Sequence, residues 1–167
     1  DPSLLKPTKP IGPFFNDIEA THMQEEGFKM IHQSQGWRMV VPSPDPKQIV
    51  EGESIKKMLD DGIIIIASGG GGMPVIEKEN GGFDGLEAVI DKDLAAERLA
   101  EAIQAELLMI LTDVDKVFIN YDTPEQKTLD TISLKELKTY YETNQFPPGT
   151  MGPKILAAIR FLESGGQ

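Results

Sequence analysis

A run of four glycines directly follows the most apolar stretch of the chain. Gly69–Gly72 come after Ile63–Ala67 and Ser68. Because glycine has no Cβ, such a run can present its backbone N–H groups to a phosphate. It is not a Walker A motif, since no Gly-Lys-Ser/Thr follows, and it is not a dinucleotide fingerprint, since Pro74 and an extended segment come next. A flexible linker is the alternative interpretation.

Two lysines stand where an anion would stabilise them. Lys92 lies between Asp91 and Asp93, just before a predicted helix. Lys154 falls in the first turn of another predicted helix, where a cation opposes the helix dipole. Lysines held by carboxylates suit the transfer of a phosphoryl group, and the carboxylates could orient them or bind Mg²⁺. An ordinary helix cap beside a surface lysine is the competing interpretation.

A third polar segment follows another apolar stretch. Thr112, Asp113 and Val114 come directly after Leu107–Leu111, and Tyr121 follows shortly. These residues could receive an adenine and a ribose, or they could form a simple turn.

Composition excludes several other kinds of chemistry. The 167 residues include no cysteine, so thiol nucleophiles, disulfides and thiolate metal sites are absent. His22 and His32 are the only histidines, and we expect both to be solvated. The formal net charge of −11 argues against nucleic acid or an anionic membrane as a partner. No apolar run is long enough to cross a bilayer. Because the chain begins Asp1-Pro2, we expect it to start within a longer protein.

The first 48 residues predict a small appendage between proline-rich connectors. Asn16 can cap a helix over 17–26, and Gly27 can end it. Alternating residues over 28–32 and 37–41 predict a hairpin.

From residue 49 onward the pattern alternates helices with apolar stretches. Strands are expected over 63–67, 86–90, 107–111 and 117–119, and helices over 54–59, 94–105, from Ser133 with Glu136 in a capping box, and 152–162. This order predicts an α/β fold with helices on both faces of a mostly parallel sheet. Ligands bind such sheets beyond the carboxyl ends of the strands, which is where the candidate residues fall.

Six motifs in order resemble those of the carbamate kinases, within the amino acid kinase family. They span 7–14, 36–44, 69–75, 88–95, 108–114 and 151–154. The resemblance covers essentially the whole chain. It implies a three-layer αβα sandwich with a protruding subdomain over 1–48 and a nucleotide-binding portion over 49–167, the N-terminal half of the fold being missing.

The resemblance also implies an activity: reversible phosphoryl transfer between ATP and carbamate, with Mg²⁺, in a cytoplasmic homodimer that makes ATP in arginine fermentation. Lys92 and Lys154 would stabilise the transferred group, Asp93 would orient both, and Lys9 would reach the substrate from the subdomain. The glycines of 69–72 (Gly69, Gly70, Gly71 and Gly72) would contact phosphate or carbamate. The nucleotide would lie among Thr112, Asp113, Val114, Tyr121, Met151 and Gly152.

The sequence departs from the family at several points. Met39 follows Arg38 where a basic or small aliphatic residue is usual, and 33–35 lack an acidic-basic pair, so closure over the substrate is in question. Family members are about twice as long, and their N-terminal Gly-Gly-Asn loop and Gly-Asn-Gly-Pro segment have no match here. We therefore expect the chain alone to be inactive. Another small-acid kinase of the family, such as an acetylglutamate kinase, and an inactive nucleotide-binding fragment are the alternatives.

Overall fold

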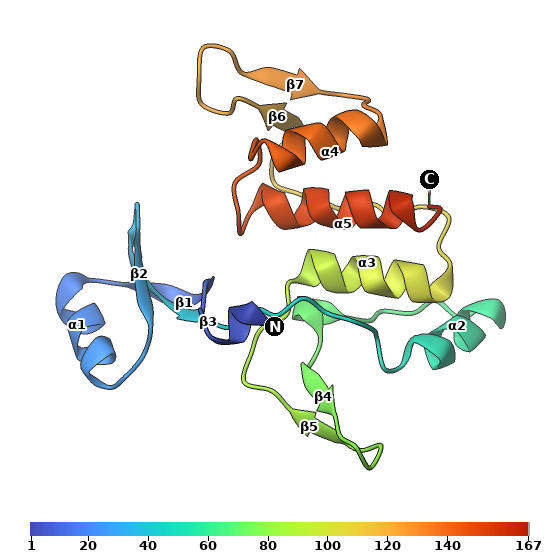
Figure 1. The fold of residues 1–167 in the computed structure, drawn as a ribbon, viewed down its shortest axis with the longest axis horizontal. Coiled ribbons are helices and arrows are strands. Elements are labelled where there is room, and N and C mark those ends of the chain that lie inside the picture. Colours follow the sequence, from blue (N-terminus) through green and yellow to red (C-terminus); the bar gives the residue numbers. More distant parts are fainter. Residues whose placement is uncertain (167) are drawn as a thin grey trace. The chain divides into compact units, whose positions relative to one another are not determined.

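The structure is a computed structural model that describes residues 1–166. In chain order, its elements are η1 (Pro2–Leu4), β1 (Lys9–Phe15), α1 (Asp17–Glu25), β2 (Met30–Gln33), β3 (Gly36–Val41), α2 (Gly52–Asp60), η2 (Gly69–Gly71), β4 (Val75–Glu77), β5 (Phe83–Gly85), α3 (Lys92–Ile103), β6 (Val117–Ile119), β7 (Lys127–Leu129), α4 (Leu134–Glu142) and α5 (Met151–Glu163) (Figure 1). The chain divides into two compact units. The first unit comprises residues 1–45 and 72–91, and the second comprises 46–71 and the described residues from 92 onward.

An antiparallel sheet in the order β1-β3-β2 forms the main part of the first unit. The hairpin of β2 and β3 agrees with the prediction, and so does α1, whose capping box joins Asn16 and Glu19. Strand β1 was not predicted, because it contains Pro10 and Pro13. Proline is tolerated on an edge strand, and within residues 1–166 β1 pairs only with β3. The short hairpin of β4 and β5 belongs to the same unit.

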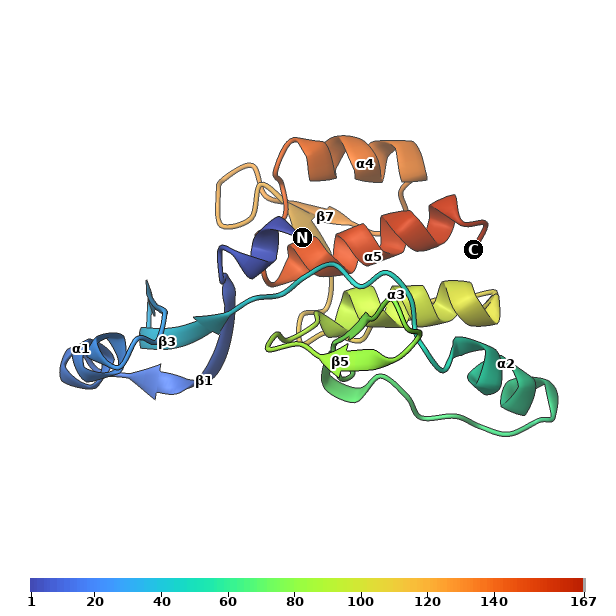
Figure 2. The same cartoon turned by 60° about the horizontal axis from the view of Figure 1, so that its bottom comes forward.

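Helices are the longest elements described in the second unit. Helix α3 packs against α5 and α2, and α4 packs on the opposite side of α5 (Figure 2). Four buried side chains form a core that joins α5 to β6 and to the loop between α4 and α5: Ile119, Phe146, Ile155 and Ile159. Burial of this apolar face fixes α5, and therefore the start of that helix.

The predicted capping box at the start of α4 is confirmed. Ser133 Oγ accepts a hydrogen bond from Glu136 N, and the Glu136 carboxylate accepts bonds from both the hydroxyl and the backbone N–H of Ser133. The side-chain bond from Ser133 is the main reason that the pKa of Glu136 lies below its ordinary value.

The prediction of a mostly parallel sheet is wrong for the described residues. The chain is an α/β protein, but the sheets described in residues 1–166 are antiparallel. Segments 63–67, 86–90 and 107–111 do not pair as strands, and 117–119 is β6, antiparallel to β7. A β-branched run favours extended backbone, but a strand also needs a neighbour to complete its hydrogen bonds.

Several large aliphatic side chains of these unpaired segments face solvent. Ile64 and Ile66 are 92% and 99% exposed, and Leu111 is 83% exposed. Apolar side chains at such density mark a surface that another polypeptide normally covers. Within residues 1–166, no helix combines the length and the apolar character that crossing a membrane would require.

Candidate functional site

The N-terminus of α3 carries a buried carboxylate bound by lysines. Asp93 is 8% exposed, and its oxygens lie 3.0 and 3.2 Å from Nζ of Lys154. Nζ of Lys92 lies 3.8 Å from the same carboxylate. A carboxylate in the first turn of a helix also interacts favourably with the helix dipole. The structure thus brings together three of the four residues that the sequence singles out for catalysis.

Helix α5 begins in a way that leaves Lys154 dependent on Asp93. Thr150, at the N-cap, makes no side-chain capping bond, and the first turn of α5 contains no acidic residue. Gly152 N donates to Pro147 O at 2.9 Å, and a Cβ on Gly152 would lie 3.0 Å from that oxygen. The tight approach fixes the first turn of α5, so Lys154 is held on Asp93 by the packing of α3 on α5.

Two lysines differ in how they meet the Asp93 carboxylate. Nζ of Lys154 lies within hydrogen-bond distance of it, whereas Nζ of Lys92 lies 3.8 Å away. The Lys154 side chain is only 17% exposed, whereas that of Lys92 is 63% exposed. Lys92 can therefore turn towards an anionic ligand while Asp93 retains Lys154. Fixed positive charge of this kind stabilises phosphoryl groups.

The fourth predicted catalytic residue, Lys9, lies in the first unit. Its Nζ donates a hydrogen bond of 2.5 Å to Oδ2 of Asp91, which is 6% exposed. From the sequence, Asp91 was expected to share with Asp93 the role of orienting Lys92 or binding Mg²⁺, and its contact with Lys9 was not predicted. The pairing could not be read from the sequence, because 82 positions separate the two residues.

The glycine run forms a tight turn. Residues Gly69–Gly71 make the 3₁₀ turn η2, closed by a bond from Gly71 N to Ser68 O, and η2 packs against α3. Gly70, Gly71 and Gly72 have φ of 69°, 102° and 79°, values that other L-residues rarely adopt. The turn therefore requires glycine at these positions, which a flexible linker would not.

The predicted nucleotide-binding residues lie on exposed loops and at the start of α5. Thr112 and Asp113 share a hydrogen bond of 3.3 Å on the surface. Tyr121 is exposed and its ring lies 6.2 Å from that of Phe118. Val114 is exposed, Met151 is partly buried and Gly152 is buried. Among the hydrogen bonds described, the bond from Thr112 to Asp113 is the one that joins two of these six residues.

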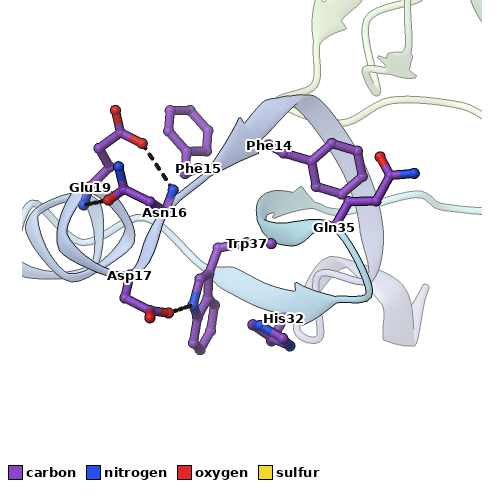
Figure 3. Close-up of a pocket in the computed structure, with 9 residues that line it drawn as sticks. Phe14, Phe15, Asn16, Asp17, Glu19, His32, Gln35 and Trp37 are labelled. Atoms are coloured by element: carbon purple, nitrogen blue, oxygen red, sulfur yellow. Dashed lines mark hydrogen bonds between the residues drawn. The ribbon is translucent and has the colours of Figure 1, made fainter.

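A pocket of about 450 Å³ lies in the first unit, and its described lining includes none of the predicted site residues. Its lining includes Phe14, Trp37, His32 and the two acids Asp17 and Glu19 (Figure 3). Both acids already accept bonds within the unit: Asp17 from Trp37 Nε1 and Glu19 from Asn16 N. The bond to Asp17 joins α1 to β3, and the bond to Glu19 completes the N-terminal cap of α1.

The described residues offer few ligands for a metal ion. Among the described residues, no group of three or more His, Asp or Glu side chains is placed to hold a metal ion. His22 and His32 are both exposed, as predicted. Mg²⁺ typically uses one or two carboxylates and completes its shell with phosphate oxygens and water. The Asp93 carboxylate already forms ion pairs with Lys92 and Lys154, so any oxygen that it offered to Mg²⁺ would be shared with a lysine.

Known proteins resemble this chain over its whole length. It is 53% identical to the carbamate kinase of Thermococcus kodakarensis and 51% identical to that of Pyrococcus horikoshii, over 169 aligned residues and 100% of this chain in both comparisons. Among solved structures, carbamate kinase from Giardia lamblia bound to citric acid matches with a TM-score of 0.90 and 39% identity over 100% of this chain and 53% of that one. The same enzyme bound to AMP-PNP matches with a TM-score of 0.83 and 40% identity, over 100% of this chain and 54% of that one.

These matches cover the whole of this chain but only part of each relative. The chain spans about half the length of the curated relatives it matches, 54% for the Pyrococcus protein and 53% for the Thermococcus protein. The sequence profile of the amino acid kinase family matches residues 11–167. The chain therefore belongs to the amino acid kinase family.

Proposed function

We propose that this chain is the C-terminal portion of a carbamate kinase, which transfers a phosphoryl group between ATP and carbamate. The observation that carries the proposal is the cluster at the start of α3, where Asp93 binds Lys154 and lies beside the exposed Lys92. The relatives named carbamate kinase support the choice of reaction, since about half of the aligned residues are identical.

In the proposed reaction, ADP and carbamoyl phosphate give ATP and carbamate. A terminal oxygen of ADP forms the new bond to phosphorus, and the bond from phosphorus to the carbamate oxygen breaks. The transition state is loose and carries its charge on the phosphoryl oxygens, so catalysis depends on position and positive charge. Lys154 supplies a fixed charge, Lys92 a mobile one, and Asp93 orients both. Lys9 would contact the carbamate end of the substrate.

The nucleotide would lie among Thr112, Asp113, Val114, Tyr121, Met151 and Gly152, and Gly69–Gly72 would hold a phosphate or carbamate oxygen. The match to a relative solved with AMP-PNP supports nucleotide binding. Mg²⁺ bound to the nucleotide would neutralise phosphate charge. We assign residues 1–48 to closure over the substrate and 49–167 to the nucleotide. A cytoplasmic homodimer working in arginine fermentation is part of the same proposal.

The exposed aliphatic segments support a longer working enzyme. We infer that 63–67 and 107–111 become strands when they pair with polypeptide that the relatives possess beyond the matched half. Such pairing would satisfy their backbone groups, cover Ile64, Ile66 and Leu111, and build the three-layer sandwich. The chain alone would then lack part of the charge that surrounds the phosphoryl group, and we expect its turnover to be near background.

The test is ATP formation from ADP and carbamoyl phosphate, coupled to a reporter enzyme, together with intact mass under native and denaturing conditions. Activity in the longer protein, with little or none in the 167-residue chain, is the expected result. Acetylglutamyl phosphate as a competing donor distinguishes the runner-up, an acetylglutamate kinase. If the longer protein prefers that donor, or uses neither, the proposal fails.

A further inference from the structure

Two adjacent contacts fasten the base of the β1-β3-β2 sheet to residues 89–91 within the first unit. Lys9, at the start of β1, pairs with Asp91 at 2.5 Å, and Val89 N donates to Pro42 O at 2.9 Å, directly after β3. Lys9 and Val41 are themselves register partners in the sheet. The point where the chain enters the sheet and the point where it leaves are thus both bound to the segment 89–91.

The pair of Lys9 and Asp91 is not an ordinary surface ion pair. The side chains are only 22% and 8% exposed, so the carboxylate is largely removed from water. A carboxylate in such a place needs a cationic partner. Removing only one partner of the pair is costly, because the other charge is then left without compensation. By contrast, Lys78 and Asp84 pair at 2.6 Å across the β4–β5 hairpin with side chains 43% and 66% exposed, and we expect that pair to contribute little.

We propose that Asp91 is a positioning residue for phosphoryl transfer, acting through Lys9. This inference rests on the proposed function, since it assigns Asp91 a part in the same reaction. An ammonium group has three N–H donors. Asp91 occupies one of them and fixes the direction of the others, so the group is oriented before an anionic substrate arrives. In the sequence, Asp91 is followed at once by Lys92 and Asp93.

Removal of the Asp91 charge has a distinctive kinetic consequence. A freed Lys9 would still attract the substrate anion, and more strongly because no carboxylate competes for it. It would no longer hold the substrate in the reactive position. Both kcat and the KM for carbamoyl phosphate should therefore fall, while the KM for ADP stays constant. A contact that only stabilised the fold would lower the melting temperature without this separation.

The experiment compares Asp91→Asn, Asp91→Glu and the matched control Asp84→Asn in the longer protein. We expect Asp91→Asn to lower kcat by about tenfold or more and to lower the KM for carbamoyl phosphate. Asp91→Glu should recover most of the lost kcat, and Asp84→Asn should match the parent. The inference is overturned if Asp91→Asn behaves like Asp84→Asn, or if Asp91→Glu is as defective as Asp91→Asn.

A second measurement separates failure of the inference from failure of the proposed function. If the parent protein makes no ATP from carbamoyl phosphate, the proposed function fails. Amide hydrogen exchange of the 167-residue chain then decides whether Asp91 fixes the sheet. Faster amide exchange at Lys9, at Ile11 and at residues 39–41 in Asp91→Asn, but not in Asp84→Asn, supports the fastening role. Equal exchange in both variants overturns it.

Discussion

Nζ of Lys154 lies 3.0 Å from a carboxylate oxygen of Asp93, and this contact joins the first turns of α5 and α3 across 61 positions of sequence. The two helix N-termini repel an extra cation, but the carboxylate between them compensates. The Lys154 side chain is thus partly buried against a carboxylate, with only 17% of it exposed.

Lys154→Met should reduce kcat of the longer protein by about a hundredfold or more, because a fixed positive charge near the transferred group is lost. Steady-state assays of ATP formation measure the effect. Lys138→Met is the matched control, since Lys138 pairs with Glu163 on the surface and has no part in the cluster. An active Lys154→Met protein would contradict the assignment.

Asp93→Asn should lower kcat and also destabilise the fold, because two ammonium groups would face each other without the carboxylate. Circular dichroism gives the melting temperature and a coupled assay gives the rate. Asp130→Asn removes a carboxylate from the exposed pair with Lys116 and should change neither quantity appreciably. Equal effects of the two substitutions on the rate and on the melting temperature would contradict the role proposed for Asp93.

Gly70→Ala should destabilise the protein by about 1 kcal/mol, because φ of 69° is unfavourable for alanine. Gly69→Ala is the matched control, since its φ is not positive and a Cβ there would meet nothing within 4 Å. Urea unfolding of both variants measures the difference in free energy. If the two alanines cost the same, the turn does not require glycine at residue 70.

Ser133→Ala should raise the pKa of Glu136 by removing its main hydrogen-bond donor. A carboxyl group whose pKa is lower in the folded state contributes stability above its unfolded pKa, and this contribution is lost as pH falls through the folded pKa. The substitution should therefore lower the melting temperature more at about pH 7 than at about pH 3. Thr139→Ala, which removes a hydroxyl bonded only to Lys135 O among the bonds described, should show no such pH dependence.

Ile66→Ser should leave the melting temperature of the 167-residue chain nearly unchanged, because the side chain is already 99% exposed. In the longer protein, the same substitution should destabilise the fold, since we infer that another strand covers Ile66. Ile18→Ser, at an exposed position of α1, should be neutral in both proteins. A neutral Ile66→Ser in the longer protein would show that residues 63–67 remain uncovered.

Local signals in the sequence were good guides to the helices. Asn16 caps α1 and Ser133 forms a capping box with Glu136, as predicted, because a cap depends only on residues close in the sequence. The capping box of Asn16 with Glu19 was not predicted. The fate of Ile63–Ala67 was not predictable in the same way. Its β-branched residues favour extended backbone, but whether it pairs depends on a neighbour elsewhere in the polypeptide.

The candidate site shows the same division between local and distant information. Lys92 and Asp93 stand out because charged residues at a predicted helix start are visible in the sequence. Asp91 belongs to the same run, yet its partner Lys9 is 82 positions away and only the structure reveals the contact. The roles of all these residues in catalysis stay predictions.

The two prolines of β1 bear on how the protein avoids aggregation. An edge strand offers unpaired N–H and C=O groups that can recruit a strand of another molecule. Pro10 and Pro13 have no N–H, so β1 is a poor template for such recruitment. Residues 63–67 contain no proline and combine exposed isoleucines with backbone that lies outside any described sheet. If the chain is made without the polypeptide that covers this segment, intermolecular β-pairing should begin there and not at the proline-bearing edge of the sheet.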